Sequence, residues 1–378
     1  MTATVSHFKV GCGDMTLFRF DDGRTLLVDI NIRPAAVDPE DETPNVIDQL
    51  RERLDTDGDG RVYVDAFLLT HPDKDHILGL VEHFHLGPPS DWSERTDKIL
   101  IREMWSSPIV FRRASRNHPL CDDACAWSTE ARRRVRLFEE QGIGGHGDKV
   151  IILGEDIDGK TDDLEEILVK AGESFSVIAG QTGAFQADLL APMLADTDEE
   201  AEELSKNNSS VILSMAITGD HVPSAARYLI GGDAEVAIWE RMRKEYADQD
   251  LAYDILIAPH HCSWHSLSHD SWSDLGEDVE VSEDARSALG QANAQARIIA
   301  SCKTITDDDS DPPCVRAERE YREILSERGG TFTCVADQPG DGPYEIEITA
   351  GGHRPKRVRL AATAAAVTGL GTQPFAHG

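Results

Sequence analysis

The chain of 378 residues carries 37 basic and 69 acidic side chains, for a formal net charge of −32, and 40% of its residues are hydrophobic. This length supports a large core, in one big domain or two modest ones. So negative a chain repels polyanions at long range, which excludes non-specific coating of DNA, whereas a local basic groove or bound metal ions would still admit a phosphate.

Three features of the sequence predict a cytoplasmic protein that does not enter a membrane. The seven cysteines are odd in number and widely spaced, unlike a disulfide framework. The first residues lack the charged start and apolar block of a secretory signal. No apolar run approaches the roughly 18 residues that a membrane-spanning helix needs.

The N-terminal part predicts strands, then a helix, then a buried strand. Short apolar runs separated by Gly and Asp predict strands within the first 35 residues. A helix is expected over 45–54, where the apolar residues fall on one face. The apolar run 62–70 predicts a buried strand that ends at His71. This order indicates a mixed α/β architecture.

The middle of the chain, about 82–205, shows little regular pattern. We expect an inserted region there, with a possible role in binding a protein partner. Beyond it, strands are expected at 211–217, 228–232, 254–259 and 296–301, helices at 234–247 and 313–328, and a final strand pair at 331–336 and 344–350. A composition rich in Ala, Thr and Gly predicts a loose C-terminal tail over 351–378. One domain is therefore expected to cover 1–350.

Four potential metal ligands stand within six residues directly after the buried strand: His71, Asp73, Asp75 and His76. Imidazoles and carboxylates are the side chains that hold zinc, manganese or iron. A strand that runs into a turn aims alternate side chains at one point. His71 and Asp73 are therefore expected at one ion, and Asp75 and His76 at a second.

Two further clusters have the same placement at the end of an apolar strand. Asp233 follows a strand whose last two residues are glycines, which allow close approach of the backbone. A carboxylate there is able to bridge two ions. His260 and His261 follow the next strand, at the carboxyl edge where open α/β sheets place their sites.

The segment HPDKDH resembles the HxHxDH signature of the metallo-β-lactamase superfamily, with Asp73 in place of the second histidine. GGD and PHHCSWHS are similar to the family's Gly-Asp and PHHGS segments. VGCGDMTLFRFDDGRTLLVD and KNNSSVILSM resemble segments of the branch that contains the soluble hydrolase domains of ComEC-like DNA-uptake proteins. The resemblance, over roughly 5–81 and 205–350, implies an αββα sandwich of two mixed sheets flanked by helices.

The resemblance also implies a ligand set. It places His71 and Asp73 at the first metal position, Asp75 and His76 at the second, and Asp233 as the bridge between them.

Either His260 or His261 completes the second metal position; spacing does not decide, although we slightly prefer His260. The family's histidine upstream of the Gly-Asp strand is absent, and Asn208 lies in that neighbourhood. One or two zinc ions, or a manganese pair recruited with substrate, therefore fit the sequence. Cys262 replaces the family's glycine, and we interpret it as a small buried residue rather than a ligand.

A metal-activated water is the expected nucleophile, and the resemblance places Asp75 to orient it. His265 follows the metal histidines and is a candidate general acid. Ser263, Ser266 and Asn208 are candidate substrate-binding residues.

The leading interpretation is a metal-dependent phosphodiesterase or nuclease that acts on a nucleotide or a nucleic-acid end. It depends on the resemblance and on the suitability of two metal ions for in-line displacement at phosphorus. Arginines in the middle of the chain form either a cationic rim for the phosphate or an ordinary solvated helix face: Arg112, Arg113, Arg116, Arg132, Arg133, Arg134 and Arg136.

Two alternatives remain. A hydrolase of thioesters or lactones is expected to have an apolar pocket, lined by Trp92, Trp105 and Trp127. A non-catalytic module of the same fold is expected to bind a protein and to lack bound metal.

Overall fold

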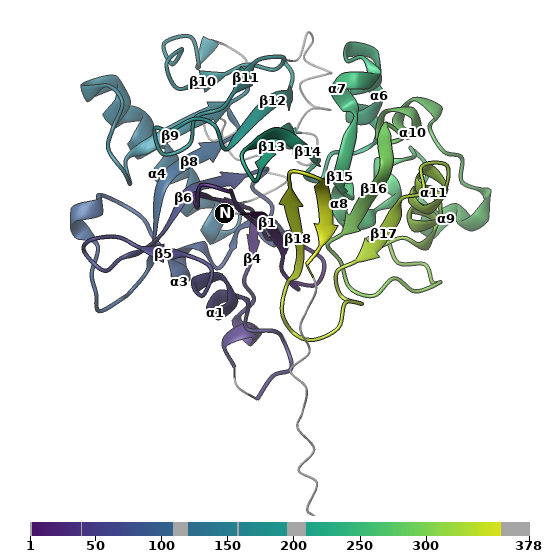
Figure 1. Cartoon of the computed structure of the whole chain (residues 1–378), viewed down its shortest axis with the longest axis horizontal. Helices are drawn as coiled ribbons and strands as arrows, with labels where there is room; N and C mark the ends of the chain where they lie inside the picture. The colour runs from purple at the N-terminus through teal and green to yellow at the C-terminus, as the bar shows by residue number, and fades with distance from the viewer. Residues whose placement is uncertain (1, 39, 109–119, 157–158, 195–208, 357–378) are drawn as a thin grey trace, which may run out of the picture.

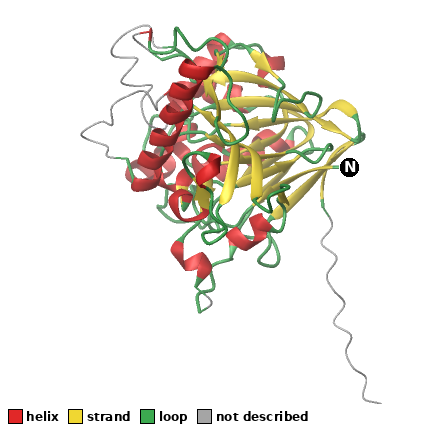
Figure 2. Ribbon diagram, turned by 90° about the vertical axis from the view of Figure 1, so that its left-hand side faces the viewer, coloured by secondary structure: helices red, strands yellow, loops and turns green. Residues whose placement is uncertain are grey.

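The computed structural model describes residues 2–38, 40–108, 120–156, 159–194 and 209–356, and their strands form two mixed sheets packed face to face (Figure 1). The first sheet has the order β10-β9-β8-β6-β3-β2-β1-β18-β19, with β5 beside β6 and β7 beside β8. The second has the order β11-β12-β13-β14-β15-β16-β17. Helices lie outside both sheets (Figures 1 and 2). The predicted architecture of two mixed sheets flanked by helices is confirmed.

The strands of the first sheet are β1 (Ala3–His7), β2 (Thr16–Arg19), β3 (Thr25–Val28), β5 (Asp55–Thr56), β6 (Val62–Leu69), β7 (Phe84–His85), β8 (Ile99–Ser106), β9 (Lys149–Leu153), β10 (Leu168–Val169), β18 (Tyr344–Thr349) and β19 (Gly352–Pro355). Those of the second are β11 (Ser174–Phe175), β12 (Phe185–Ala191), β13 (Ile212–Gly219), β14 (Val222–Ile230), β15 (Tyr253–Ile257), β16 (Ala292–Ala300) and β17 (Thr331–Cys334). The short strand β4 (Ile30–Asn31) bridges to residues 77 and 78.

The longer helices are α1 (Val46–Arg51), α4 (Asp122–Gln141), α6 (Val236–Glu245), α10 (Glu283–Leu289) and α11 (Val315–Ser326). Single helical turns are α2 (Lys74–Ile77), α3 (Leu80–His83), α7 (Asp248–Leu251), α8 (Pro259–Cys262) and α9 (Trp272–Leu275). In the described ranges, no helix combines the length and the apolar character needed to cross a lipid bilayer.

Parallel pairing brings the polar strand ends together. In the first sheet β3, β6, β8 and β9 run parallel, and in the second β14, β15, β16 and β17 do. The carboxyl ends of parallel strands meet at one edge of a sheet. The segments that follow β3, β6, β14 and β15 therefore lie at neighbouring edges of the two sheets.

Three apolar layers hold the sandwich together. One lies between the sheets, and the other two lie between each sheet and its outer helices. On α4, the buried residues Ala124, Trp127, Ala131 and Val135 recur at spacings of three and four, so they share one face. Trp127 packs edge-on against Phe67 of β6, with ring centroids 4.9 Å apart.

The described strands between residues 82 and 194 belong to the two sheets. β8 lies in the middle of the first sheet between β6 and β9, and β12 lies beside β13 in the second. Strands β8 and β12 are buried along most of their length. The described part of this segment is thus structural core.

The expected final strand pair is wrong, because its two strands belong to different sheets. β17 is the edge of the second sheet and runs parallel to β16, whereas β18 pairs antiparallel with β1 in the first sheet. An apolar pattern predicts a strand but does not predict which other strand it pairs with. β19, within the expected tail, pairs with β18, so the chain remains ordered beyond residue 350.

Candidate metal centre

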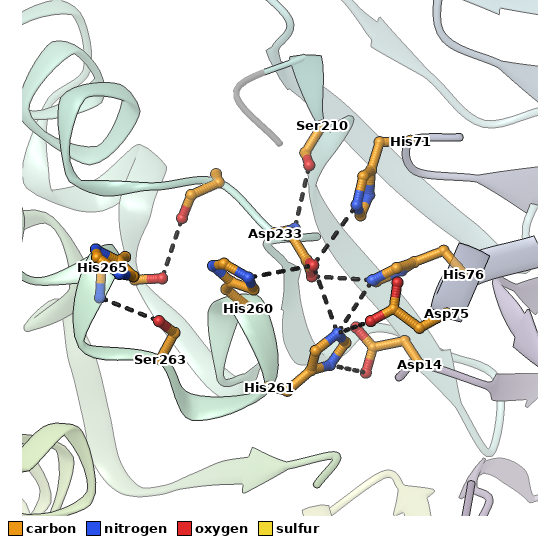
Figure 3. A network of polar contacts seen from close by, with 12 residues as sticks. Asp14, His71, Asp75, His76, Ser210, Asp233, His260, His261, Ser263 and His265 are labelled. Atoms are coloured by element: carbon orange, nitrogen blue, oxygen red, sulfur yellow. Dashed lines mark hydrogen bonds and ion pairs between the residues drawn. The ribbon is translucent and has the colours of Figure 1, made fainter. Parts of the chain in front are cut away.

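Four side chains from distant parts of the chain meet at the carboxyl edges of the strands: Asp14, His76, Asp233 and His261 (Figure 3). Each offers one carboxylate oxygen or imidazole nitrogen, and these four atoms all lie within 4.8 Å of one another. Asp233 Oδ1 is 3.0 Å from His76 Nε2, and Asp233 Oδ2 is 3.4 Å from His261 Nε2. Ligands about 2.0–2.1 Å from a tetrahedral zinc ion are roughly 3.3 Å apart, so this spacing fits a shared cation.

Several polar atoms at this cluster lack a well-formed hydrogen bond among the described residues. Asp14 Oδ1, His71 Nε2, Asp233 Oδ1 and His261 Nδ1 are buried without one, and their side chains make ion-pair contacts with one another and with His76. The Nε2 atoms of His76 and His261 face each other at 3.2 Å. Burying an unsatisfied polar group costs about 1–3 kcal/mol. A cation that accepts lone pairs would satisfy several of these atoms at once, so the donor set fits a metal ion.

Asp233 lies in the middle of a wider ring of imidazoles (Figure 3). Its Oδ2 atom is 3.6 Å from His71 Nε2 and 3.8 Å from His260 Nε2. Asp75 Oδ2 lies 3.3 Å from His261 Nε2, and the Asp75 side chain is 42% exposed. Asp233 is therefore placed to bridge two positions, with Asp75 at the open side.

The charges of the cluster are strongly coupled. Burial alone would raise the pKa of Asp233, but the imidazoles of His261 and His76 hold the pKa of that carboxyl well below its usual range. Burial would lower the pKa of both histidines, yet the Asp233 carboxylate raises them well above the usual value. Burial raises the pKa of Asp14 to about 6. A cation that binds here therefore competes with protons on the imidazoles.

His76 is held by a carboxylate that the sequence analysis did not single out. Asp29, directly after β3, lies with its Oδ2 atom 2.8 Å from His76 Nδ1 and accepts a hydrogen bond from the Thr70 hydroxyl at 2.6 Å. Histidines that bind metals typically donate their other ring N–H to such a partner.

Asp14 is the second carboxylate that the sequence analysis missed, and two hydrogen bonds hold its loop. The Asp14 amide donates to the Asp75 carbonyl at 3.2 Å, and the Ser301 hydroxyl donates to the Gly13 carbonyl at 2.7 Å. Gly13 has φ 141°, and a Cβ there would lie 2.2 Å from Asn31 Nδ2. Asp14 and Asp29 both fall in the N-terminal segment VGCGDMTLFRFDDGRTLLVD that carries the family resemblance, and that resemblance is the signal that could have identified them.

The turn after β15 sends its two histidines to different sides of Asp233 (Figure 3). His261 joins the compact cluster, whereas His260 lies outside it. The geometry therefore favours His261 as the metal ligand over His260, which the sequence analysis slightly preferred. Cys262 has φ 68°, in the left-handed region that favours glycine, and it occupies the position of the family's glycine. Its side chain is fully buried, as expected.

Two expected site residues lie away from the cluster. Among the described residues, no hydrogen bond or ion pair involves the Asp73 carboxylate; its backbone carbonyl accepts from the His76 amide at 3.1 Å. His265 lies on the far side of His260 from the cluster (Figure 3), with Nε2 3.9 Å from Asp311 Oδ2. The geometry therefore does not support a general acid at His265.

Two of the expected substrate-binding residues form hydrogen bonds within the protein, and the third lies outside the described residues. The Ser263 hydroxyl donates to Asp311 Oδ1 at 2.6 Å, and the Ser266 hydroxyl donates to the Ala234 carbonyl at 3.1 Å. Both serines are fully buried. Asn208 lies outside the described residues.

Two of the arginines expected to form a cationic rim are instead paired with carboxylates of the protein. Arg134 is buried and its Nε donates to Glu130 at 2.8 Å, while Arg133 donates to Glu130 and Asp148 at 2.7 Å each. Burying a guanidinium requires such a partner. The arginines expected nearer the centre of the segment lie outside the described residues: Arg112, Arg113 and Arg116.

The tryptophans do not share one pocket. Trp105 is buried between the two sheets, whereas Trp127 is buried between the first sheet and its helices. They therefore lie on opposite faces of the first sheet. Trp92 is half-buried, and its indole N–H donates to the Lys98 carbonyl at 2.7 Å.

No family model matches the chain, and no curated protein matches it. A diphosphatase of the PhnP family is similar at 13% identity and a TM-score of 0.33, over 79% of this chain and 87% of that one. A long form of RNase Z from yeast is similar at 11% identity and a TM-score of 0.35, over 86% of this chain and 44% of that one. At such scores the fold assignment depends on the sheet order of this chain, and the chemistry depends on its side chains.

Proposed function

We propose that this protein is a metal-dependent hydrolase that cleaves a phosphodiester bond in a nucleotide or at a nucleic-acid end. The observation that carries the proposal is the buried cluster of Asp14, His76, Asp233 and His261, whose ligand atoms all lie within 4.8 Å of one another. Zinc suits this set of imidazoles and carboxylates, and manganese is the alternative cation.

Each side chain has a role in holding the cation. His76, His261, Asp14 and Asp233 are the proposed ligands, and His71, 3.6 Å from Asp233 Oδ2, is the donor available to a second ion. When bound, a divalent cation lowers the pKa of water towards neutrality and stabilises negative charge on a phosphoryl oxygen. Asp29 fixes the ring of His76 through Nδ1.

Asp75 is proposed to orient the nucleophilic water. Burial alone would raise the pKa of Asp75, but the hydrogen bond from His261 lowers it, so the group is a carboxylate at neutral pH. A carboxylate accepts hydrogen bonds and does not donate them. Because this side chain is 42% exposed, it is able to accept a hydrogen bond from a water molecule at the open side of the cluster.

Two observations favour a small phosphorylated substrate over the alternatives. The net charge of −32 disfavours a long polyanion, and Arg133 and Arg134 are already paired with Glu130, so a bound cation is the positive charge proposed to receive the phosphate. Trp105 and Trp127 do not line a shared pocket as the acyl-hydrolase alternative expects, since they lie on opposite faces of a sheet. The ComEC-like resemblance adds the nucleic-acid end as a substrate class.

The test combines metal content with activity. Purified protein is analysed for bound metal, then assayed on bis(p-nitrophenyl) phosphate and short oligonucleotides with zinc, manganese or magnesium. We expect metal-dependent cleavage that His76→Ala and Asp233→Asn abolish. His269→Ala, which removes an exposed histidine paired with Glu240, is the matched control and should retain activity.

Each other outcome has a definite meaning. Bound metal without phosphodiester cleavage overturns the phosphodiesterase assignment and directs the assays to thioesters and lactones. Wild-type protein that binds no metal overturns the metal centre and leaves a protein-binding module of this fold.

A further inference from the structure

The turn that carries His261 has an unusual backbone. His260, His261 and Cys262 have φ of 50°, 53° and 68°, so three consecutive residues other than glycine adopt the left-handed conformation. L side chains rarely adopt this conformation, and it persists only where surrounding contacts fix it. The turn therefore needs an external support, and its support decides where the His261 ring points.

The support comes from the loop between β16 and α11. Asp311 Oδ1 accepts hydrogen bonds from the Ser263 hydroxyl at 2.6 Å and from the Trp264 amide at 3.0 Å. These two donors follow the left-handed residues directly. The Cys314 amide donates to the Cys262 carbonyl at 2.9 Å, within the turn itself. Asp311 is 48 residues from Ser263 in the sequence, so only the fold brings them together.

The surroundings of Asp311 indicate that its hydrogen bonds matter more than its charge. The Asp311 side chain is only 3% exposed. Its Oδ2 atom has no hydrogen-bond partner among the described residues, and the imidazole of His265 is 3.9 Å away. An apolar side chain here would leave the Ser263 hydroxyl and the Trp264 amide unsatisfied, which a buried turn tolerates poorly.

We propose that Asp311 is a positioning residue of the metal centre. By accepting these two hydrogen bonds, it holds the left-handed turn and thereby directs His261 towards Asp233, 3.4 Å away. The inference rests on the proposed function, because it takes His261 as a metal ligand. Asp311 itself touches neither the metal nor the substrate.

The test measures zinc affinity in three variants of the full chain by competition with a metallochromic indicator. Asp311→Ala should bind zinc about 10–100-fold more weakly, the range found when a supporting partner of a ligand is removed. Asp311→Asn keeps an acceptor oxygen and should stay close to wild type. Asp309→Ala removes the same charge from an exposed position in the same loop and should have no effect.

Cobalt substitution supplies a second readout. The visible absorption of bound cobalt(II) reports the ligand geometry, and it should change in Asp311→Ala and not in Asp309→Ala. A loss of general stability would not change that spectrum. If Asp311→Ala does not fold, Ser263→Ala removes one of the two hydrogen bonds and should give a smaller loss of zinc affinity.

Three results would overturn the inference. They are wild-type zinc affinity in Asp311→Ala, wild-type zinc affinity in Ser263→Ala if that variant is the one tested, and a loss in Asp311→Asn as large as in Asp311→Ala. The last would make charge, not hydrogen bonding, the cause. Wild-type protein that binds no zinc would instead overturn the proposed function, and this inference with it.

Discussion

Asp29 and His76 form a buried pair in which Asp29 Oδ2 lies 2.8 Å from His76 Nδ1. The same carboxylate accepts from the hydroxyl and the amide of Thr70, at 2.6 and 2.8 Å. A carboxylate accepts only, so the pair places the imidazole proton on Nδ1. Nε2 lies 3.0 Å from Asp233 Oδ1 and would offer its lone pair to a cation once that cation displaces the Nε2 proton.

Asp29→Asn should weaken zinc binding by about 10–100-fold, because the carboxamide no longer fixes the orientation and proton of His76. Asn tolerates the left-handed φ of 53° at this position, so the backbone is kept. Zinc titration checks the effect. Asp220→Asn, at an exposed left-handed position with φ 48°, is the matched control. Equal affinity in both variants would show that Asp29 does not orient His76.

Gly13→Ala should disrupt the loop that carries Asp14. A Cβ at this position would lie 2.2 Å from Asn31 Nδ2 and 2.7 Å from the Asp75 carbonyl, so both neighbours must move. We expect a lower thermal midpoint and weaker zinc binding. Gly58→Ala adds the same methyl group where nothing lies within 4 Å. If Gly13→Ala behaves like Gly58→Ala in both measurements, the close packing of this loop is unimportant.

Two substitutions at Cys262 should separate backbone strain from packing. Cys262→Gly relieves the left-handed φ of 68° at the cost of a small buried side chain. Cys262→Val places a β-branched residue there and adds volume to a filled core, at a cost of about 2 kcal/mol or more. Urea unfolding should rank valine well below glycine in stability. The reverse order would mean that core packing outweighs the backbone.

Glu130→Gln should destabilise the protein by about 3–5 kcal/mol at neutral pH, because it leaves the buried Arg134 without its carboxylate. Burial alone would raise the pKa of Glu130, but hydrogen bonds from Arg133 and the charge of Arg134 lower it. A lowered folded-state pKa means that the stabilisation is present above the unfolded-state value of about 4.3. It is lost as the pH falls through the folded-state value.

The difference in unfolding free energy between wild type and Glu130→Gln should therefore shrink in acid. Denaturant unfolding at several pH values measures it. Glu139→Gln, exposed on the same helix, should show little effect at any pH. A difference that stays constant with pH would indicate that the carboxylate charge of Glu130 contributes nothing.

Local patterns in the sequence determined much of the architecture. The buried strand β6 and the helices α6 and α11 follow from apolar spacing that any chain segment shows by itself. His76, Asp233 and His261 were among the expected ligands because each follows an apolar strand. Strand ends that carry imidazoles or carboxylates are visible without knowledge of the fold.

Tertiary structure alone decided which of these residues meet. Asp14 and Asp29 lie near the other residues because β3 pairs with β6 and β2 pairs with β3, an order that spacing does not specify. Asp73 is not in the cluster, because it lies at the start of α2, where side chains no longer alternate as they do along a strand. The Ser263 hydroxyl donates a hydrogen bond to Asp311, a residue 48 positions away in the sequence. The pattern of a segment is local, whereas a metal centre is built from side chains whose distances depend on the packing of the whole sandwich.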